Sequence, residues 1–235
     1  MKIFWNDIKK MSTKEHSYYW IVPSVLMSVF MIFYFSEVPP LVSLICPPAN
    51  REWGLLENLQ LVIIFCILLL SIYAFLKTTN IIQKLGFIVI GCFTLFIFLE
   101  EMDYGKHFAQ LIGGQTESYL MQYIPDKSIH GQGNNAINFK RIVKIMIILI
   151  FIISPFLKSR IKNPYLQYLI PQARIAIVAV LTIVVLYVPR YIVESGLRKD
   201  GGLGRNIAEF SEVMMYYVFL IYLYQLVFVK QHKWP

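Results

Sequence analysis

Long apolar runs alternate with short polar segments along the whole chain. Each of the six runs comes close to the roughly 20 residues that a helix needs to cross a bilayer. The runs are uniformly apolar, whereas strands of a membrane β-barrel alternate between apolar and polar residues. The pattern therefore predicts an all-α integral membrane protein, a bundle of about six transmembrane helices in a single domain over residues 1–235. The predicted spans are residues 17–35, 54–76, 85–102, 142–157, 175–193 and 207–229.

The composition supports the membrane class. Of the 235 residues, 57% are hydrophobic and 15% are charged, whereas roughly a quarter of a soluble domain is charged. The net charge of +8 comes from Lys and Arg in short clusters between the apolar runs and at both ends. That arrangement is typical of membrane orientation, so we expect membrane lipid as a partner and no nucleic acid. The three cysteines form no CxxC pair, which argues against a thiol metal site or a disulfide framework.

The basic residues gather on one side of the predicted spans. Cytoplasmic loops carry an excess of Lys and Arg, so the bias predicts that both termini lie in the cytoplasm. The first apolar run follows a basic arm, but it is aromatic-rich and lacks a small-residue cleavage site, so we interpret it as a retained span. The expected location is the bacterial cytoplasmic (inner) membrane. The twelve basic residues assigned to the cytoplasmic side are Lys2, Lys9, Lys10, Lys14, Lys77, Lys84, Lys158, Arg160, Lys162, Arg174, Lys230 and Lys233.

Acidic side chains gather at the other ends of the spans. Because consecutive spans alternate in direction, the starts of the second and sixth spans reach the same non-cytoplasmic face as the ends of the third and fifth. The cytoplasmic ends of the spans contain no comparable set. Charged groups in membrane spans are costly, so this gathering indicates a functional site. The acids are Glu52, Glu57, Glu100, Glu101, Glu194, Glu209 and Glu212, and Asp103, His107, His130, Arg190, Arg198 and Arg205 are expected on the same face.

Glu100 and Glu101 give the strongest signal in this set. They end the third span, where the partial negative charge of a helix C-terminus opposes a carboxylate. Asp103 and His107 follow Glu100 at i+3 and i+7, on one helical face if the helix continues that far. The predicted catalytic residues are Glu100, Glu101, Asp103, His107 and His130, and the predicted substrate-binding residues are Glu57, Asn134, Arg190, Arg198, Arg205, Glu209 and Glu212.

Some of these residues also have ordinary structural explanations. Glu52 and Glu194 are typical of solvated groups at a membrane interface. Glu209 and Glu212 begin a helix, where carboxylates are favourable without any function. Arg190 is spaced to pair with Glu194 across one turn.

Short motifs at these positions resemble a family of proteins. The chain resembles, in order along the sequence, an uncharacterised bacterial multi-pass membrane protein family with a Glu-Glu-x-x-Trp-Gly-Gln motif after the third span and an Asn/His-rich turn. Tyr104 and Lys106 stand where that family has Trp and Gln. The resemblance implies a site at these positions and no particular reaction. The matching elements are Gly54-x-x-Glu57, Glu100-Glu-Met-Asp-Tyr-Gly-Lys106, the turn His130 to Asn135, and Glu209-x-x-Glu212.

The first functional hypothesis is an enzyme, a hydrolase or transferase acting on a lipid or lipid-linked substrate. Two carboxyl groups held close together in a low dielectric titrate apart, so Glu100 and Glu101 are an expected acid and base, assisted by His107 or His130. The three arginines of the substrate-binding set are suited to a phosphate headgroup. The only cofactor that the pattern suggests is a divalent metal, zinc or manganese, with candidate ligands Glu100, Asp103, His107, His130, Glu209 and Glu212.

Two other functions fit the same residues. Intramembrane acids also serve proton- or cation-coupled transporters, although here they gather at one end of the spans and not at mid-depth. The third hypothesis is a non-catalytic membrane subunit whose acidic face docks a protein partner, and it predicts that conservative substitutions are tolerated.

Overall fold

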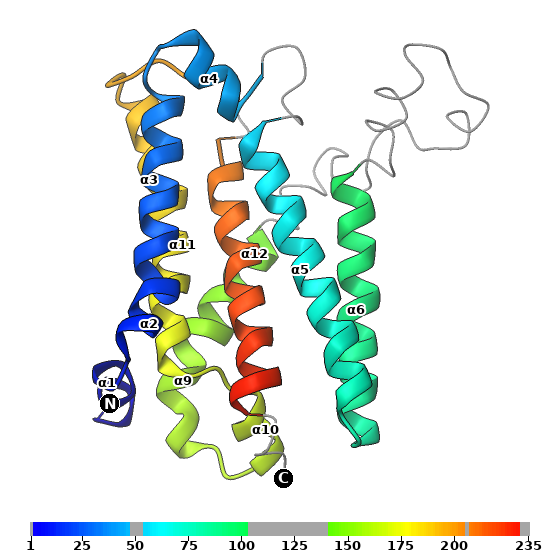
Figure 1. The fold of residues 1–235 in the computed structure, drawn as a ribbon. Helices are drawn as coiled ribbons and strands as arrows, with labels where there is room; N and C mark the ends of the chain where they lie inside the picture. Colours follow the sequence, from blue (N-terminus) through cyan, green and yellow to red (C-terminus); the bar gives the residue numbers. More distant parts are fainter. Residues whose placement is uncertain (1, 48–53, 103–140, 205–206, 231–235) are drawn as a thin grey trace, which may run out of the picture. The chain divides into compact units, whose positions relative to one another are not determined.

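A computed structural model describes residues 2–47, 54–102, 141–204 and 207–230, which are helical with short connections and contain no strand (Figure 1). Six helical stretches are long and apolar enough to cross a membrane. They confirm the predicted all-α fold with about six helices of membrane-spanning length. The stretches are Thr13–Tyr34, Leu55–Lys77, Ile81–Glu101, Arg141–Arg160, Ala173–Glu194 and Glu209–Val229.

The elements follow one another as α-helices interrupted by short π- and 3-10-helical segments. In chain order they are α1 (Lys2–Lys9), α2 (Thr13–His16), the π segment η1 (Ser17–Ile21), α3 (Val22–Tyr34), α4 (Pro39–Ile45), α5 (Leu55–Lys77), α6 (Ile81–Glu101), the π segment η6 (Ile148–Ile153), α9 (Ser154–Leu157), the 3-10 segment η7 (Lys158–Arg160), α10 (Pro164–Leu169), α11 (Ala173–Glu194), α12 (Glu209–Tyr224) and the π segment η9 (Gln225–Val229).

The chain divides into two compact units. Unit 1 comprises residues 1–63 and 146–235, and unit 2 comprises residues 64–145. The single domain predicted from the sequence therefore stays a prediction.

Unit 2 contains a helical hairpin made by the second half of α5 and by α6. Asn80 caps α6, because its side-chain oxygen accepts from the backbone N–H groups of Ile82 and Gln83. The hydroxyl of Thr78 donates to Oε1 of Gln83 at 2.5 Å, so this buried amide oxygen has a donor. Phe65 and Phe98 bring the two helices together, with ring centroids 6.0 Å apart.

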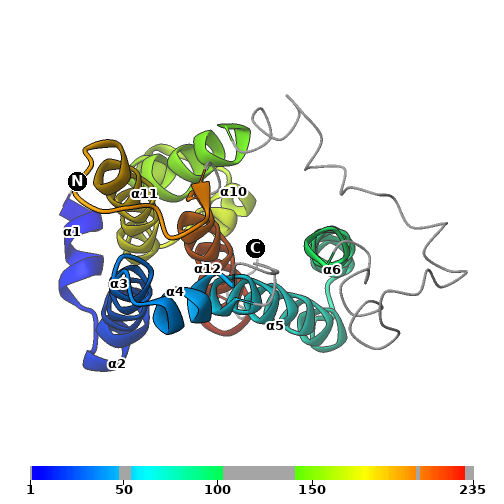
Figure 2. The same cartoon turned by 90° about the horizontal axis from the view of Figure 1, so that it is seen from above.

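The central helix of unit 1 is α11, which contacts α1, α3, α12 and two of the π segments, η1 and η6. Its small buried residues Ala176 and Ala179 let neighbouring helices approach closely. Across from them, α12 buries Phe210, Met214 and Val218. Seen from above, α3, α11 and α12 appear end-on (Figure 2). A helix with apolar residues on all sides is typical of a membrane span, and α11 and α12 have that character.

A proline explains the π segment η1. In this segment the N–H of Val22 donates to the carbonyl of Ser17, five residues back. The next bond in that series needs an N–H from Pro23, which has none. The carbonyl of Tyr18 accepts instead from the hydroxyl of Tyr217 on α12, at 2.5 Å. The hydroxyl therefore replaces the missing backbone donor and joins two spans.

A proline also explains the π segment η6. The N–H of Ser154 donates to the carbonyl of Leu149, and Pro155 has no N–H for the next carbonyl, that of Ile150. The hydroxyl of Ser154 donates to that carbonyl. Both prolines thus sit inside spans without leaving these two carbonyl groups unsatisfied in lipid.

One end of unit 1, here called the terminal end, contains α1, the start of α11 and the end of η9. The buried ammonium group of Lys230 donates to the carbonyls of Tyr168 and Ile170 at 2.5 Å, at the end of α10. A cation at a helix C-terminus is favourable, because the last carbonyl groups there have no helical partners. The hydroxyl of Tyr168 donates in turn to the carbonyl of Leu226 at 3.2 Å. The other end, with the start of α12, is called the opposite end.

The predicted orientation can be tested by labelling single cysteines in intact cells. Thr79 lies between α5 and α6 and Ser195 follows α11, and both are exposed. In a background without native cysteines, a membrane-impermeant maleimide is expected to label Ser195→Cys and not Thr79→Cys. Labelling of Thr79→Cys alone would show that the predicted topology is inverted.

Candidate functional site

The opposite end of unit 1 carries two of the predicted site residues on the first turn of α12. Glu209 is only 7% exposed, although it is the first residue of the helix, and Glu212 is half-buried. The positive end of the helix dipole favours carboxylates at these positions. Phe210 and Ser211 between them are buried. The first turn of α12 is therefore inside the protein, and its carboxylates are largely shielded from solvent.

Gln60 on α5 faces this turn. Its side chain is 1% exposed, and its amide nitrogen donates to the carbonyl of Glu209 at 3.5 Å. Its amide oxygen is buried and accepts no hydrogen bond from any described residue. Leaving a buried polar group without a partner costs about 1–3 kcal/mol. The free-energy cost of burying the Gln60 side chain is therefore poorly offset by its hydrogen bonds to the described residues.

The residues Glu57, Gln60, Glu209 and Glu212 are called the α5–α12 site. Glu57 precedes Gln60 by three residues, so both lie on one side of α5, as Glu209 and Glu212 do on α12. Buried oxygens of Glu209 and Glu212, Oε2 and Oε1 respectively, accept no hydrogen bond within the described residues, although both side chains make other interactions. The site is rich in hydrogen-bond acceptors, so its chemistry favours a ligand that brings donors, protons or a cation.

Sequence reasoning missed Gln60. A single glutamine within the apolar run from Leu59 to Ile64 is a weak signal, since polar residues occur singly in many spans. Its spacing of three residues from Glu57 is the one feature that could have indicated it, because residues at i and i+3 share a helical face.

Unit 2 carries the other predicted pair. Glu100 is 4% exposed on the last turn of α6, and Glu101, the last residue of the helix, is half-buried. The helix closes at Met102, whose N–H donates to the carbonyl of Phe98 at 3.1 Å. Both glutamates have interaction partners. A buried carboxylate at a helix C-terminus is unfavourable by itself, which agrees with a special role, but the catalytic role of this pair stays a prediction.

Several predicted site residues lie outside the described residues. These are Asp103, His107, His130, Asn134 and Arg205. Within the described parts of the chain, no three His, Cys, Asp or Glu side chains are grouped so that they could hold a metal ion. Half of the predicted ligands lie outside that search, so the divalent metal site stays a prediction.

Two predicted arginines belong to the opposite end. Arg190 is half-buried one residue after Pro189 and makes no ion pair with any described residue. The spacing that suggests pairing with the exposed Glu194 is therefore not used. Arg198 is 60% exposed, with its guanidinium 3.8 Å from the carboxylate of Glu37. An exposed pair of this kind contributes at most about 1 kcal/mol. The surroundings of neither arginine indicate a phosphate site, and the predicted role of both stays a prediction.

The segment between α11 and α12 is fixed by more hydrogen bonds than its composition suggests. Its glycines and basic residues predict a flexible, cationic loop, but Asp200 holds it in a fixed turn. The Oδ2 atom of Asp200 accepts from the N–H of Gly204 at 2.6 Å, and its Oδ1 atom accepts from the hydroxyl of Tyr34 on α3. That hydroxyl also accepts from the N–H of Leu203 at 2.9 Å. Aspartate next to glycines favours such turns. The loop is thereby fixed to the end of α3 shortly before α12 begins.

Gly201 makes that close approach possible. A β-carbon at this position would lie 2.7 Å from the ring of Tyr34 and 2.8 Å from its carbonyl oxygen. Any larger residue would push the loop away from α3, because contacts this short are repulsive. The loop therefore depends on Asp200, Tyr34 and Gly201 together.

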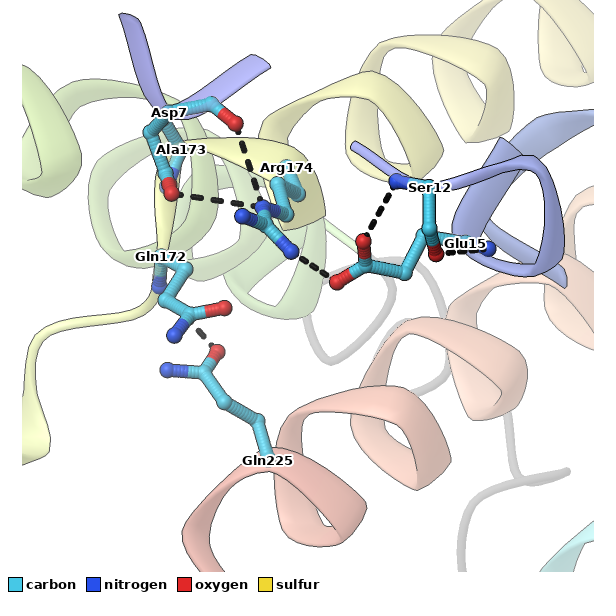
Figure 3. Close-up of polar contacts among 7 residues, drawn as sticks. All are labelled: Asp7, Ser12, Glu15, Gln172, Ala173, Arg174 and Gln225. Carbon is cyan, nitrogen blue, oxygen red and sulfur yellow. Dashed lines mark hydrogen bonds and ion pairs between the residues drawn. The ribbon is translucent and has the colours of Figure 1, made fainter. Parts of the chain in front are cut away.

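The terminal end of unit 1 contains a charged cluster that the sequence pattern does not predict. Arg174, at the start of α11, lies between the carboxylates of Asp7 and Glu15 (Figure 3). Its Nε atom is 3.2 Å from Oδ1 of Asp7, and a terminal nitrogen contacts Glu15. The partners are far apart in the sequence, so no local spacing reveals the cluster.

Asp7 also caps α11 from outside the helix. Gln172, the residue before α11, makes no side-chain cap, and Oδ2 of Asp7 accepts from the N–H of Ala173 at 3.0 Å. The backbone N–H of Gln172 donates to the side chain of Gln225 at 3.1 Å (Figure 3). The N-terminal arm and the first residue of η9 therefore both satisfy donors at the start of α11, which would otherwise lack partners.

The fold and these sites define a polytopic helical membrane protein with buried polar groups near the ends of its spans. No family model, no curated protein and no solved structure matches the chain. The resemblance suggested by the sequence motifs therefore stays a prediction.

Proposed function

We propose that this chain is an enzyme, a hydrolase or transferase, that acts on a lipid or lipid-linked substrate in the bacterial cytoplasmic membrane. In this proposal the α5–α12 site provides acid–base groups, and the predicted pair Glu100 and Glu101 provides others. The observation that carries the proposal is the buried amide oxygen of Gln60, which has no donor among the described residues and lies next to Glu209.

The chemistry follows from the residue types. An acid–base role assigns one carboxyl group of the site as the general base and another as the general acid. The ionised group accepts a proton from water or from a substrate hydroxyl as it attacks, and the protonated group donates to the leaving oxygen. Gln60 accepts a hydrogen bond from a substrate hydroxyl or amide and orients it. These roles require no nucleophilic serine or cysteine.

The depth of the acids favours an enzyme over a carrier. Glu209 is the first residue of its span and Glu100 the second-last residue of another. Substrate and ion sites of secondary transporters lie near the middle of the bilayer. Acids at span ends are at the level of lipid headgroups, where the polar part of a lipid-linked substrate is found.

A second candidate is a proton- or cation-coupled transporter. It is favoured by the acceptor-rich α5–α12 site, because carboxylate and amide oxygens are suitable ligands for hard cations. A docking subunit is less well supported, since a buried polar site is not available to the surface of a protein partner.

The lipid pool of cells distinguishes these candidates. Cells that carry Glu209→Gln are expected to accumulate one lipid or lipid-linked intermediate, because substitution removes the carboxyl group and keeps the side-chain size. Cells with Glu194→Gln, an exposed control at the end of α11, are expected to match wild type. The measurement is mass spectrometry of total lipid extracts. Unchanged lipids with altered sodium or proton uptake would favour the transporter, and no change in either quantity would contradict both candidates.

A further inference from the structure

The N-terminal helix α1 lies crosswise to the membrane spans of unit 1. Figure 1 shows α3 and α11 from the side and α1 nearly end-on. Figure 2 shows α3 and α11 end-on and α1 from the side. Asp7 joins α1 to the first residue of α11, Ala173, where that span begins. The helix α1 therefore lies across the end of the span α11.

The inner side of α1 is fixed to α11. Ile8 packs against Ala173 and Ala176, and Asp7 contacts both Ala173 and Arg174. The chain then turns at Ser12, which with Glu15 forms a reciprocal capping box at the start of α2. These contacts hold α1 against α11, so the side of α1 that carries no such contacts faces away from the spans.

The outer side of α1 combines an aromatic residue with positive charge. Trp5 is 55% exposed, and Lys9 and Lys10 are exposed beside it, as is Lys14 in α2. Two acidic residues of this region, Asp7 and Glu15, are occupied by Arg174 and do not offset these lysines at the surface. Tryptophan is enriched at membrane–water interfaces, and lysines beside it attract anionic headgroups.

We infer that the outer side of α1, with Trp5 and Lys9, together with the neighbouring Lys10 and Lys14 of α2, binds the headgroups of anionic phospholipids. The partner is the lipid surface itself, because this helix lies in the plane of the bilayer and its free charge is positive. A second tryptophan near α1 agrees with a membrane–water interface at this end. Trp20 is 42% exposed, and its indole N–H donates to His16 at 3.0 Å. The inference is independent of the proposed enzyme function.

Lipid-selective quenching of Trp5 tests this inference. The full-length protein is placed in nanodiscs of phosphatidylcholine and phosphatidylglycerol in which only one of the two lipids is brominated near the carbonyl end of its acyl chains, at equal mole fraction. The Trp5 signal is the difference between wild type and Trp5→Phe. Brominated phosphatidylglycerol is expected to quench this signal several-fold more than brominated phosphatidylcholine.

Two double variants make the test specific. Lys9→Gln with Lys10→Gln is expected to equalise quenching by the two lipids. The control variant Arg160→Gln with Lys162→Gln is expected to keep the preference; it removes exposed cations at the end of the fourth span and just after it. Equal quenching in wild type would overturn the inference, as would the absence of quenching by either lipid. Loss of the preference in the control variant would also overturn it, because the selectivity would not then belong to α1.

Discussion

Replacement of Gln60 by leucine is expected to stabilise the protein and to remove its function. The substitution eliminates a buried amide oxygen without a donor among the described residues and one long hydrogen bond to Glu209, and leucine suits the apolar surroundings of α5. A gain of about 1 kcal/mol in the free energy of unfolding is expected, because an unsatisfied buried polar group costs more than a long hydrogen bond contributes. Denaturant titration in detergent micelles measures the stability, and the lipid pool measures the function.

Gln83→Leu is the matched control. Gln83 is also buried in a span, but its amide oxygen accepts from Thr78 at 2.5 Å. Its replacement is expected to destabilise the protein by about 1 kcal/mol, because the hydroxyl of Thr78 loses this acceptor. Equal destabilisation of both variants would show that Gln60 is an ordinary structural residue and would contradict a functional α5–α12 site.

Replacement of Arg174 by methionine is expected to cause a large loss of stability. Arg174 is 15% exposed, and its removal leaves Asp7 and Glu15, at 27% and 22% exposure, without their cation. Breaking a fully buried ion pair costs about 3–5 kcal/mol, and the partial exposure here reduces the expected loss to about 2 kcal/mol. The measurement is the free energy of unfolding, together with the rate at which protease cleaves the N-terminal arm.

Arg198→Met serves as the control for this prediction. Arg198 also faces a carboxylate, that of Glu37, but the pair is exposed and 3.8 Å apart. A change below about 0.5 kcal/mol is expected, because solvent screens the pair. Equal losses in both variants would contradict the assignment of the terminal cluster as the element that holds α1 to α11.

The spans could be predicted because each is an apolar run of nearly the length of a bilayer. Their boundaries were less predictable where polar residues belong to the helix. The first span begins at Thr13, four residues before the predicted start, because Ser12 and Glu15 form a capping box. The third span begins at Ile81 because Asn80 caps it, although polar Gln83 and Lys84 follow.

The candidate site could be predicted only in part. The burial of Glu209 and Glu100 agrees with their selection from the sequence, since acids at span ends stand out against apolar neighbours. Gln60 did not stand out, because an amide carries no charge. The contacts of Asp200 with Tyr34 and of Arg174 with Asp7 join residues 166 and 167 positions apart, so only the folded chain reveals them.

The most direct test of the α5–α12 site is its reaction with a hydrophobic carbodiimide. Dicyclohexylcarbodiimide adds to a protonated carboxylic acid in apolar surroundings, and the resulting O-acylisourea rearranges to a stable N-acylurea of the same composition. Mass spectrometry of peptides from the membrane-embedded protein is expected to show this adduct on Glu209 or Glu212, with loss of function in proportion to labelling. The adduct is expected to disappear in the double variant Glu209→Gln, Glu212→Gln. Complete absence of label on both residues of the wild-type protein would contradict an acid–base site at the start of α12.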